Sequence, residues 1–306
     1  ERKPMKALLV YPECPDTFWG FRHALKFISR KAAQPPLGII TIAAMLPSDW
    51  DLRLIDMAVS QLRDSDLEWA DMVFISAMSI QRDSAKEVIA RCKAIGVKTV
   101  AGGPMFTSTP DEFDEVDHLV LNEAELTLPL FLRDLANGNP QHIYRLSGFA
   151  DLNETPTPLY NLLPKDKYAQ MNIQYSRGCP FECEFCDISV LFGRRVRTKS
   201  ADQMVAELDA LYEYGWKGDV LIVDDNFIGN ARKLKKEILP LIMEWMDKRG
   251  HPFSFQTEAS INLADDEELM SMMAQAGFGM VFIGIESPEE DSLAECNKVQ
   301  NRNRDL

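Results

Sequence analysis

Three cysteines, Cys179, Cys183 and Cys186, lie within one stretch of the 306-residue chain at C-x3-C-x2-C spacing. Thiolate sulfurs are soft ligands that suit zinc ions and iron–sulfur clusters. Four thiolates would saturate either kind of site, so three in one loop leave one metal position open for a small molecule. Half of a zinc site is the less favoured interpretation, because the sequence has no second Cys or His pair at zinc-ligand spacing.

The stretch from Arg177 to Cys186 resembles the cluster-binding loop of radical S-adenosylmethionine (radical SAM) enzymes, including an aromatic residue, Phe185, before the third cysteine. The resemblance implies a 4Fe-4S cluster on the three cysteines as the catalytic centre. It also implies that S-adenosylmethionine (SAM) chelates the open iron, with Phe185 among the cofactor-binding residues. The basic run Arg194–Lys199 follows the loop, and Arg197 within it suits the carboxylate of a small ligand; a solvated loop is the alternative.

The second half of the chain predicts four β/α units that begin at the cysteine loop, because short apolar runs alternate there with helical periodicity. The predicted strands are 173–176, 220–223, 253–257 and 280–284. The resemblance implies a (β/α)6-type partial barrel with SAM across the carboxyl ends of its strands. Acids at those ends are therefore candidate cofactor-binding residues, with helix caps and salt-bridge partners as the alternative. The candidates are Asp224, Asp225, Glu258 and Glu286.

The first half predicts a parallel, doubly wound α/β sheet, because five apolar runs between residues 6 and 137 alternate with helical segments. The predicted strands are 7–11, 52–55, 72–76, 99–101 and 118–121, and the predicted helices are 36–46, 81–95 and 123–135. Ligands bind such sheets beyond the carboxyl ends of the strands. No G-x-G-x-x-G follows the first strand, which disfavours a nicotinamide or flavin dinucleotide.

This half resembles a cobalamin-binding Rossmann-like domain. Ser76-Ala77-Met78 and Gly102-Gly103 stand where such domains carry a Ser-x-Leu-like element and a Gly-Gly pair. Residues 34–38 replace the Asp-x-His-x-x-Gly loop of better-known members, so the resemblance implies cobalamin with no protein histidine on cobalt. His23, the nearest histidine, is interpreted as a surface or helix-packing residue, and an unliganded packing domain is the alternative for the whole half. The residues implied in cobalamin binding are Pro36, Leu37, Gly38, Ser76, Met78, Gly102 and Gly103.

The domain organisation follows from these patterns. We expect a cobalamin-binding domain over 1–140, a linker over 141–172 and a radical SAM partial barrel over 173–306. The linker lacks clear periodicity, and its Thr155–Leu159 stretch is extended because residues before proline avoid the helical region. Two strands of the barrel are absent, which predicts a fragment of a longer protein, truncated after about four β/α units.

Composition narrows the classes of partner. The formal charge is −14, and the only dense basic run is the one after the cysteine loop, so we expect no nucleic-acid partner. The longest apolar run, Leu37–Leu46, is too short to cross a bilayer, and no stretch resembles a signal peptide. Six cysteines, three of them isolated, do not form a disulfide framework, which indicates a reducing cytoplasm.

Four segments resemble one subgroup of cobalamin-binding radical SAM proteins, which includes hopanoid and bacteriochlorophyll methylases. They are residues 16–19, 101–107, 223–230 and 284–288. The resemblance implies a methyltransferase in which a 5′-deoxyadenosyl radical abstracts hydrogen from an unactivated carbon and methylcobalamin delivers the methyl group. It also implies an external electron donor such as flavodoxin or ferredoxin. Phe18 and Trp19 lie in an aromatic loop that suits a small, apolar substrate.

Two other functions stay open. One is a cobalamin-dependent radical SAM enzyme that catalyses rearrangement or cyclisation, which would form product without S-adenosylhomocysteine in step. The other is a non-catalytic cobalamin or iron–sulfur binding module, which would bind its cofactor without cleaving SAM.

Overall fold

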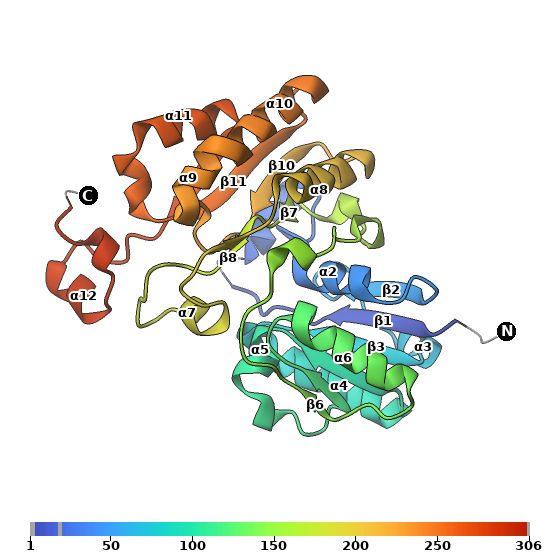
Figure 1. The fold of residues 1–306 in the computed structure, drawn as a ribbon. Helices are drawn as coiled ribbons and strands as arrows, with labels where there is room; N and C mark the ends of the chain where they lie inside the picture. Colours follow the sequence, from blue (N-terminus) through green and yellow to red (C-terminus); the bar gives the residue numbers. More distant parts are fainter. Residues whose placement is uncertain (1–3, 18–19, 305–306) are drawn as a thin grey trace. The chain divides into compact units, whose positions relative to one another are not determined.

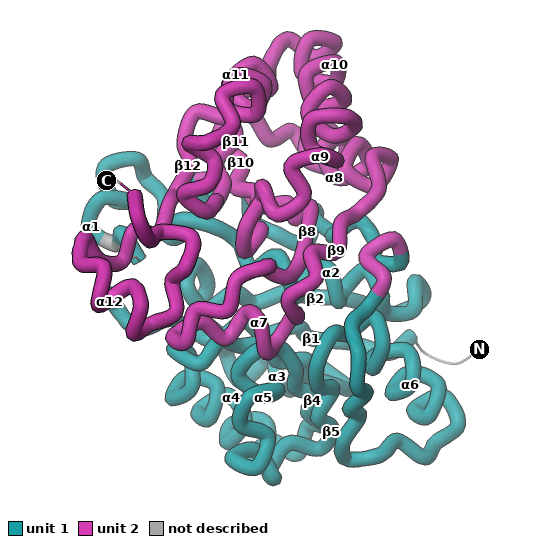
Figure 2. The backbone as a smooth tube through the Cα atoms, turned by 60° about the vertical axis from the view of Figure 1, so that its left-hand side comes forward, with its two compact units in different colours: residues 1–150, 154–169 teal, residues 151–153, 170–306 magenta. Residues whose placement is uncertain are grey.

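The structure, a computed structural model, describes residues 4–17 and 20–304. The chain forms two compact units, which Figure 2 shows in different colours. Unit 1 comprises residues 1–150 and 154–169, and unit 2 comprises residues 151–153 and 170–306. The segment 16–19, which carried part of the subgroup resemblance and the aromatic loop, includes Phe18 and Trp19, and these two lie outside the described residues.

Unit 1 contains one parallel sheet of six strands in the order β2-β1-β3-β4-β5-β6 (Figure 1). The strands are β1 (Lys6–Tyr11), β2 (Asp51–Asp56), β3 (Met72–Ser76), β4 (Lys98–Gly102), β5 (His118–Val120) and β6 (Ile143–Tyr144). The strand order reverses between β1 and β3, which makes this the switch point of a doubly wound sheet. The five predicted strands are confirmed. The sixth, β6, comes from the stretch interpreted as linker and pairs with β5 in parallel.

Helices cover both faces of this sheet. Successive strand residues point to opposite faces, and apolar side chains on both faces need to be buried. Leu8, Val10 and Val73 pack in one cluster with buried residues of α3 and α4. On the opposite face, Phe74 of β3 meets Phe131 of α6 with ring centroids 6.3 Å apart. The helices of unit 1 are α1 (Arg22–Leu25), α2 (Leu37–Met45), α3 (Asp64–Trp69), α4 (Arg82–Ile95), α5 (Pro104–Ser108) and α6 (Ala124–Ala136).

Helix α4 forms as its periodicity predicts. Val88, Ile89 and Cys92 are buried on one face, and Ile95 packs against the same cluster. Gly96 ends the helix with φ 84°, a left-handed conformation that glycine adopts without steric strain.

Unit 2 contains a parallel sheet in the order β12-β11-β10-β7, of which Figure 1 labels β7, β10 and β11. The strands of this sheet are β7 (Met171–Ile173), β10 (Gly218–Ile222), β11 (Phe253–Ala259) and β12 (Phe278–Ile283). Three of the four predicted strands are confirmed, and the first lies earlier than predicted. The predicted strand 173–176 shares only Ile173 with β7. The chain then forms β8 (Ser176–Arg177), which pairs in antiparallel fashion with β9 (Arg197–Thr198). The helices are α7 (Ile188–Leu191), α8 (Ala201–Glu213), α9 (Ala231–Lys233), α10 (Leu239–Arg249), α11 (Glu267–Gln275) and α12 (Glu290–Glu295).

The helical segment between β10 and β11 is interrupted. A π-helical turn, Leu234–Ile238, separates α9 from α10. Pro240 lies in the first turn of α10 and has no N–H to give to the preceding turn, which accounts for the wider turn before it. Short 3-10 turns complete the chain at Lys26–Ile28, Ser79–Gln81, Pro110–Glu112, Leu152–Glu154, Tyr160–Leu162, Lys165–Lys167, Phe227–Asn230, Ile261–Asp265 and Val299–Asn301.

Candidate cofactor sites

The three motif cysteines lie on a loop, residues 178–196, that is closed at its base by the β8–β9 ribbon. Arg177 pairs with Arg197, and the backbone N–H of Cys179 donates to the carbonyl of Gly193 over 3.2 Å. Gly178 opens the loop with φ 92°, and a Cβ there would lie within about 3 Å of the carbonyl oxygens of residues 192, 193 and 195. Only glycine allows the two ends of the loop to approach this closely.

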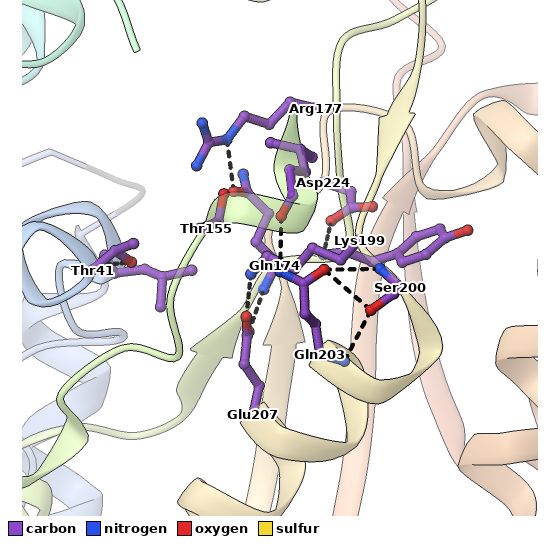
Figure 3. Close-up of polar contacts among 12 residues, drawn as sticks. Thr41, Thr155, Gln174, Arg177, Lys199, Ser200, Gln203, Glu207 and Asp224 are labelled. Carbon is purple, nitrogen blue, oxygen red and sulfur yellow. Dashed lines mark hydrogen bonds and ion pairs between the residues drawn. The ribbon is translucent and has the colours of Figure 1, made fainter. Parts of the chain in front are cut away.

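A buried carboxyl group holds the start of this loop. Asp224 accepts hydrogen bonds from the backbone N–H of Tyr175 at 2.8 Å and from the Ser176 hydroxyl at 2.6 Å (Figure 3). Burial raises the pKa of Asp224 to about 7, against the lowering effect of these hydrogen bonds. Both oxygens of Asp224 accept hydrogen bonds within the fold, so this residue anchors the start of the loop. Its contact with SAM, which the sequence suggested, stays a prediction.

A buried ion pair holds the end of the loop. Lys199 and Glu207 of α8 form an ion pair with side chains only 2% and 1% exposed. The backbone N–H of Lys199 donates to Tyr175, and Glu207 also accepts from the N–H of Gln174 at 3.4 Å (Figure 3). The sequence analysis placed Lys199 in the basic run after the cysteine loop and missed Glu207. The available signal was an acid on the apolar face of α8, beside Leu208.

Asp225 and Glu258 come from the carboxyl ends of β10 and β11, as predicted. Asp225 accepts from the backbone N–H of Gly178 at 3.1 Å. Burial raises the pKa of Asp225, while Arg177 and Arg197 oppose this. Lost hydration raises the pKa of Glu258, and the charge of Asp225 raises it further. The structure therefore brings these two acids and the candidate Arg197 into one electrostatic neighbourhood beside Cys179 and Cys186, whose thiols also sense Asp225.

Glu286 and Phe185 both contact Lys298, a residue that sequence reasoning missed. Glu286, with φ 66°, forms an ion pair with Lys298 at 2.7 Å. The Lys298 ammonium also lies 5.5 Å from the ring centroid of Phe185, a cation–π distance. Glu286 thus has a cationic partner of its own, while the Phe185 side chain stays 57% exposed beside the cysteines.

The thiols form a donor set that fits an iron–sulfur cluster. All three are free and half-buried, and burial raises the pKa of Cys179 and Cys186. Among residues 4–17 and 20–304, no three Cys, His, Asp or Glu side chains are gathered closely enough to hold a metal ion. Thiols lose their protons when they bind metal, so cluster binding at this loop would release protons.

The predicted cobalamin residues on β3 and β4 meet at the carboxyl edge of the unit 1 sheet. Ser76 is the register partner of Gly102. A Cβ on Gly103, where φ is 96°, would lie 2.9 Å from the Ser76 hydroxyl oxygen, and one on Gly102 would lie 2.5 Å from the carbonyl oxygen of Val120. The fold itself therefore requires glycine at both positions, because any side chain there would collide with neighbouring protein atoms. A contact between these glycines and a nucleotide tail stays a prediction.

The other predicted cobalamin residues lie on neighbouring elements. Pro36 is the buried N-cap of α2, Leu37 and Gly38 form its first turn, and Met78 is 43% exposed after β3. Among the four histidines, all described, His23 is exposed on α1 and His118 begins β5 at the opposite edge of the sheet. The absence of a histidine ligand to cobalt stays a prediction.

A cavity of about 710 Å³ also lies beyond the carboxyl ends of β1 and β2. The loops that follow these two strands line it together with α4. None of the predicted cobalamin residues is among its lining residues, so it is a hollow that sequence reasoning did not identify.

Two family models match the chain. A B12 binding domain covers residues 27–132, and the radical SAM superfamily covers residues 173–305. The chain is a B12-binding radical SAM protein. The first match covers the edge that contains Ser76, Gly102 and Gly103, and the second covers the cysteine loop.

This B12-binding radical SAM protein is 47% identical over 304 residues to an uncharacterized methyltransferase of Synechocystis, covering 99% of this chain and 56% of the relative. It is 35% identical over 301 residues to the hopanoid C-2 methylase of Rhodopseudomonas palustris, covering 97% and 57%. The radical SAM methyltransferase TsrM of Kitasatospora setae, solved with cobalamin and a [4Fe-4S] cluster, superposes with a TM-score of 0.69 at 14% identity, over 95% of this chain and 60% of that one. This likeness shows the fold alone.

The B12-binding radical SAM protein spans little more than half the length of the two curated relatives. In the described part of the chain, no helix is both long and apolar enough to cross a bilayer.

Proposed function

We propose that the protein is a cobalamin-dependent radical SAM methyltransferase that adds a methyl group to an unactivated carbon of a small molecule. The observation that carries this proposal is the cysteine loop, which presents three free thiols in a chain that also contains a B12 binding domain. The methyltransferase and methylase names of two relatives support methyl transfer rather than rearrangement.

Unit 2 would hold the cluster and SAM. Cys179, Cys183 and Cys186 are the proposed cluster ligands. Asp225 and Glu258 supply negative charge beside them, which suits the SAM ammonium, and Arg197 supplies positive charge for its carboxylate. When bound, the cluster and SAM supply a 5′-deoxyadenosyl radical, and cobalamin supplies the methyl group.

Unit 1 would hold cobalamin by close approach of the backbone. Gly102 and Gly103 leave the carboxyl edge of the sheet without side-chain bulk beside Ser76. Met78 and the first turn of α2 would contribute the neighbouring surface. We further propose an external electron donor of the flavodoxin or ferredoxin class, since the cluster must be reduced before it acts. We also propose an apolar substrate and a location in the reducing cytoplasm.

The test replaces Cys179, Cys183 and Cys186 together by alanine. The variant should lose the cluster and form no 5′-deoxyadenosine from SAM under a strong reductant, because no thiolates remain to bind iron. Cys296→Ala is the matched control, since this half-buried cysteine lies outside the motif and contacts the loop through its backbone carbonyl. The control should keep the cluster and should still form 5′-deoxyadenosine.

Deoxyadenosine formation by the triple variant at the wild-type rate would overturn the assignment of the cysteines. A wild-type protein that turns over its substrate without S-adenosylhomocysteine in step would favour rearrangement or cyclisation over methyl transfer. Cofactor binding by the wild type without any SAM cleavage would favour a non-catalytic module.

A further inference from the structure

Each cysteine of the loop faces a hydrogen-bond donor. The sulfur of Cys179 accepts hydrogen bonds from the backbone N–H of Phe181 and from the side-chain amide of Asn226. The Asn226 nitrogen lies 4.0 Å from this sulfur. The thiol of Cys186 has the backbone N–H of Ile188. These donors come from the loop itself or from the end of β10.

Cys183 receives its donor from a distant part of the chain. The side-chain amide nitrogen of Gln300, 117 residues further on, lies 3.5 Å from the Cys183 sulfur. Gln300 belongs to the 3-10 turn Val299–Asn301, which follows α12. Nothing in the cysteine motif specifies this contact.

The turn that carries Gln300 is fixed against both the sheet and the loop. The Asn301 side-chain amide donates to the carbonyls of Gly284 and Ile285, at 2.9 Å each, after β12. The Asn297 side-chain amide donates to the carbonyl of Glu182 at 2.8 Å, next to Cys183 in the loop. These bonds hold Gln300 at the sulfur through its backbone.

The amide nitrogen of the Gln300 side chain contacts the Cys183 sulfur, and the amide oxygen takes no part in this contact. Its Oε1 atom is buried and accepts no hydrogen bond from the described residues. A buried amide acceptor without a donor is unfavourable, so the orientation of this amide is not explained by bonds to its oxygen. The contact that remains to explain its orientation is the one to Cys183.

We propose that Gln300 is a positioning residue that sets the reduction potential of the cluster through a hydrogen bond from its side-chain amide to the Cys183 thiolate. The proposal rests on the proposed function, because it requires a cluster on the three cysteines. Reduction by the external donor adds one electron to the cluster and increases the negative charge on its thiolate ligands. A donor at the sulfur stabilises that added charge, so it raises the potential.

The test is a potentiometric titration of the reconstituted protein, followed by electron paramagnetic resonance of the reduced cluster. Gln300→Met keeps the length of the side chain and removes the donor. At the wild-type midpoint potential, the ratio of reduced to oxidised cluster should fall threefold to tenfold, where tenfold corresponds to about 59 mV for a one-electron couple. Samples are compared at equal iron-to-protein ratio.

Asn297→Gly is the matched control, because it removes the clamp on the loop carbonyl without adding charge beside the cluster, and glycine tolerates the positive φ of 54° at this position. Its midpoint should stay closer to that of the wild type than the midpoint of Gln300→Met. An unchanged midpoint in Gln300→Met, or an equal shift in both variants, would overturn the role of Gln300.

A third variant covers the case in which Gln300→Met does not retain its cluster. Gln300→Lys keeps an N–H donor on a long side chain, and its midpoint should equal or exceed that of the wild type; a lower midpoint would overturn the proposal. A wild-type protein that binds no cluster would instead overturn the proposed function, so the two failures are distinguishable.

Discussion

At the residue scale, acids buried at the base of the cysteine loop play positioning roles that their place in the sequence does not reveal. Asp224 and Asp225 are adjacent, yet Asp224 is 1% exposed and bonds Tyr175 and Ser176, whereas Asp225 bonds Gly178 at the loop entrance. The first anchors the strand that leads into the loop. The second remains near the thiols, where a cofactor would bind.

The protonation of Asp224 predicts a pH dependence of stability. Its pKa is about 7 in the folded protein and about 4 when unfolded, so folding favours the protonated form. Its contribution to the free energy of unfolding is therefore fully present below pH 4 and is lost as the pH rises toward 7. Asp224→Asn removes this titration.

The measurement is denaturant unfolding of the wild type and of Asp224→Asn across this range. The stability of the wild type relative to the variant should fall by about 1 kcal/mol per pH unit between about pH 4 and pH 7. A relative stability that rises with pH would mean that Asp224 is buried as a paired anion, which would contradict this account.

At the element scale, long periodic segments could be predicted from the sequence and short tertiary ones could not. Helix α4 has fourteen residues with one apolar face, and its pattern defined both its type and its end at Gly96. Strands β6 and β8 have two residues each, too few to show a period, and they exist only because β5 and β9 pair with them.

The candidate site divides in the same way. The cysteines are a local motif, so their spacing was sufficient to find them. Lys298 and Gln300 reach the loop from more than a hundred residues away, and Glu207 meets Lys199 only because α8 packs there. Such contacts are set by the fold and leave no pattern in one sequence.

The first turn of α2 offers a prediction that separates folding from ligand binding. A Cβ at Gly38 would meet no atom within 4 Å, so the fold does not require glycine here. Gly38→Ala should therefore stabilise the ligand-free protein by about 0.5–1 kcal/mol, because glycine weakens helices. If α2 contacts cobalamin as proposed, the same methyl group should lower the cobalamin retained after desalting.

Unfolding of the ligand-free protein provides the internal control for that comparison. A Gly38→Ala protein that is more stable yet retains less cobalamin supports a ligand contact. Equal or greater retention would remove Gly38 from the cobalamin surface and leave Ser76, Gly102 and Gly103 as the candidates.

At the scale of the whole molecule, each unit presents one parallel sheet with its candidate residues at the carboxyl ends of the strands. In unit 1 these ends carry Ser76 and the glycine pair, and in unit 2 they carry Asp225 and Glu258 beside the cysteine loop. Placement of ligands at this edge is general for parallel α/β sheets. The two units therefore offer separate surfaces for two cofactors in one chain.

The most direct measurement follows the methyl group itself. The protein is reconstituted anaerobically with iron, sulfide and hydroxocobalamin, desalted, reduced, and given SAM with a trideuterated methyl group. We expect mass spectrometry to find the deuterated methyl group on the extracted cobalamin, together with S-adenosylhomocysteine. A protein that retains both cluster and cobalamin but yields neither labelled cobalamin nor S-adenosylhomocysteine would contradict the proposed methyl transfer.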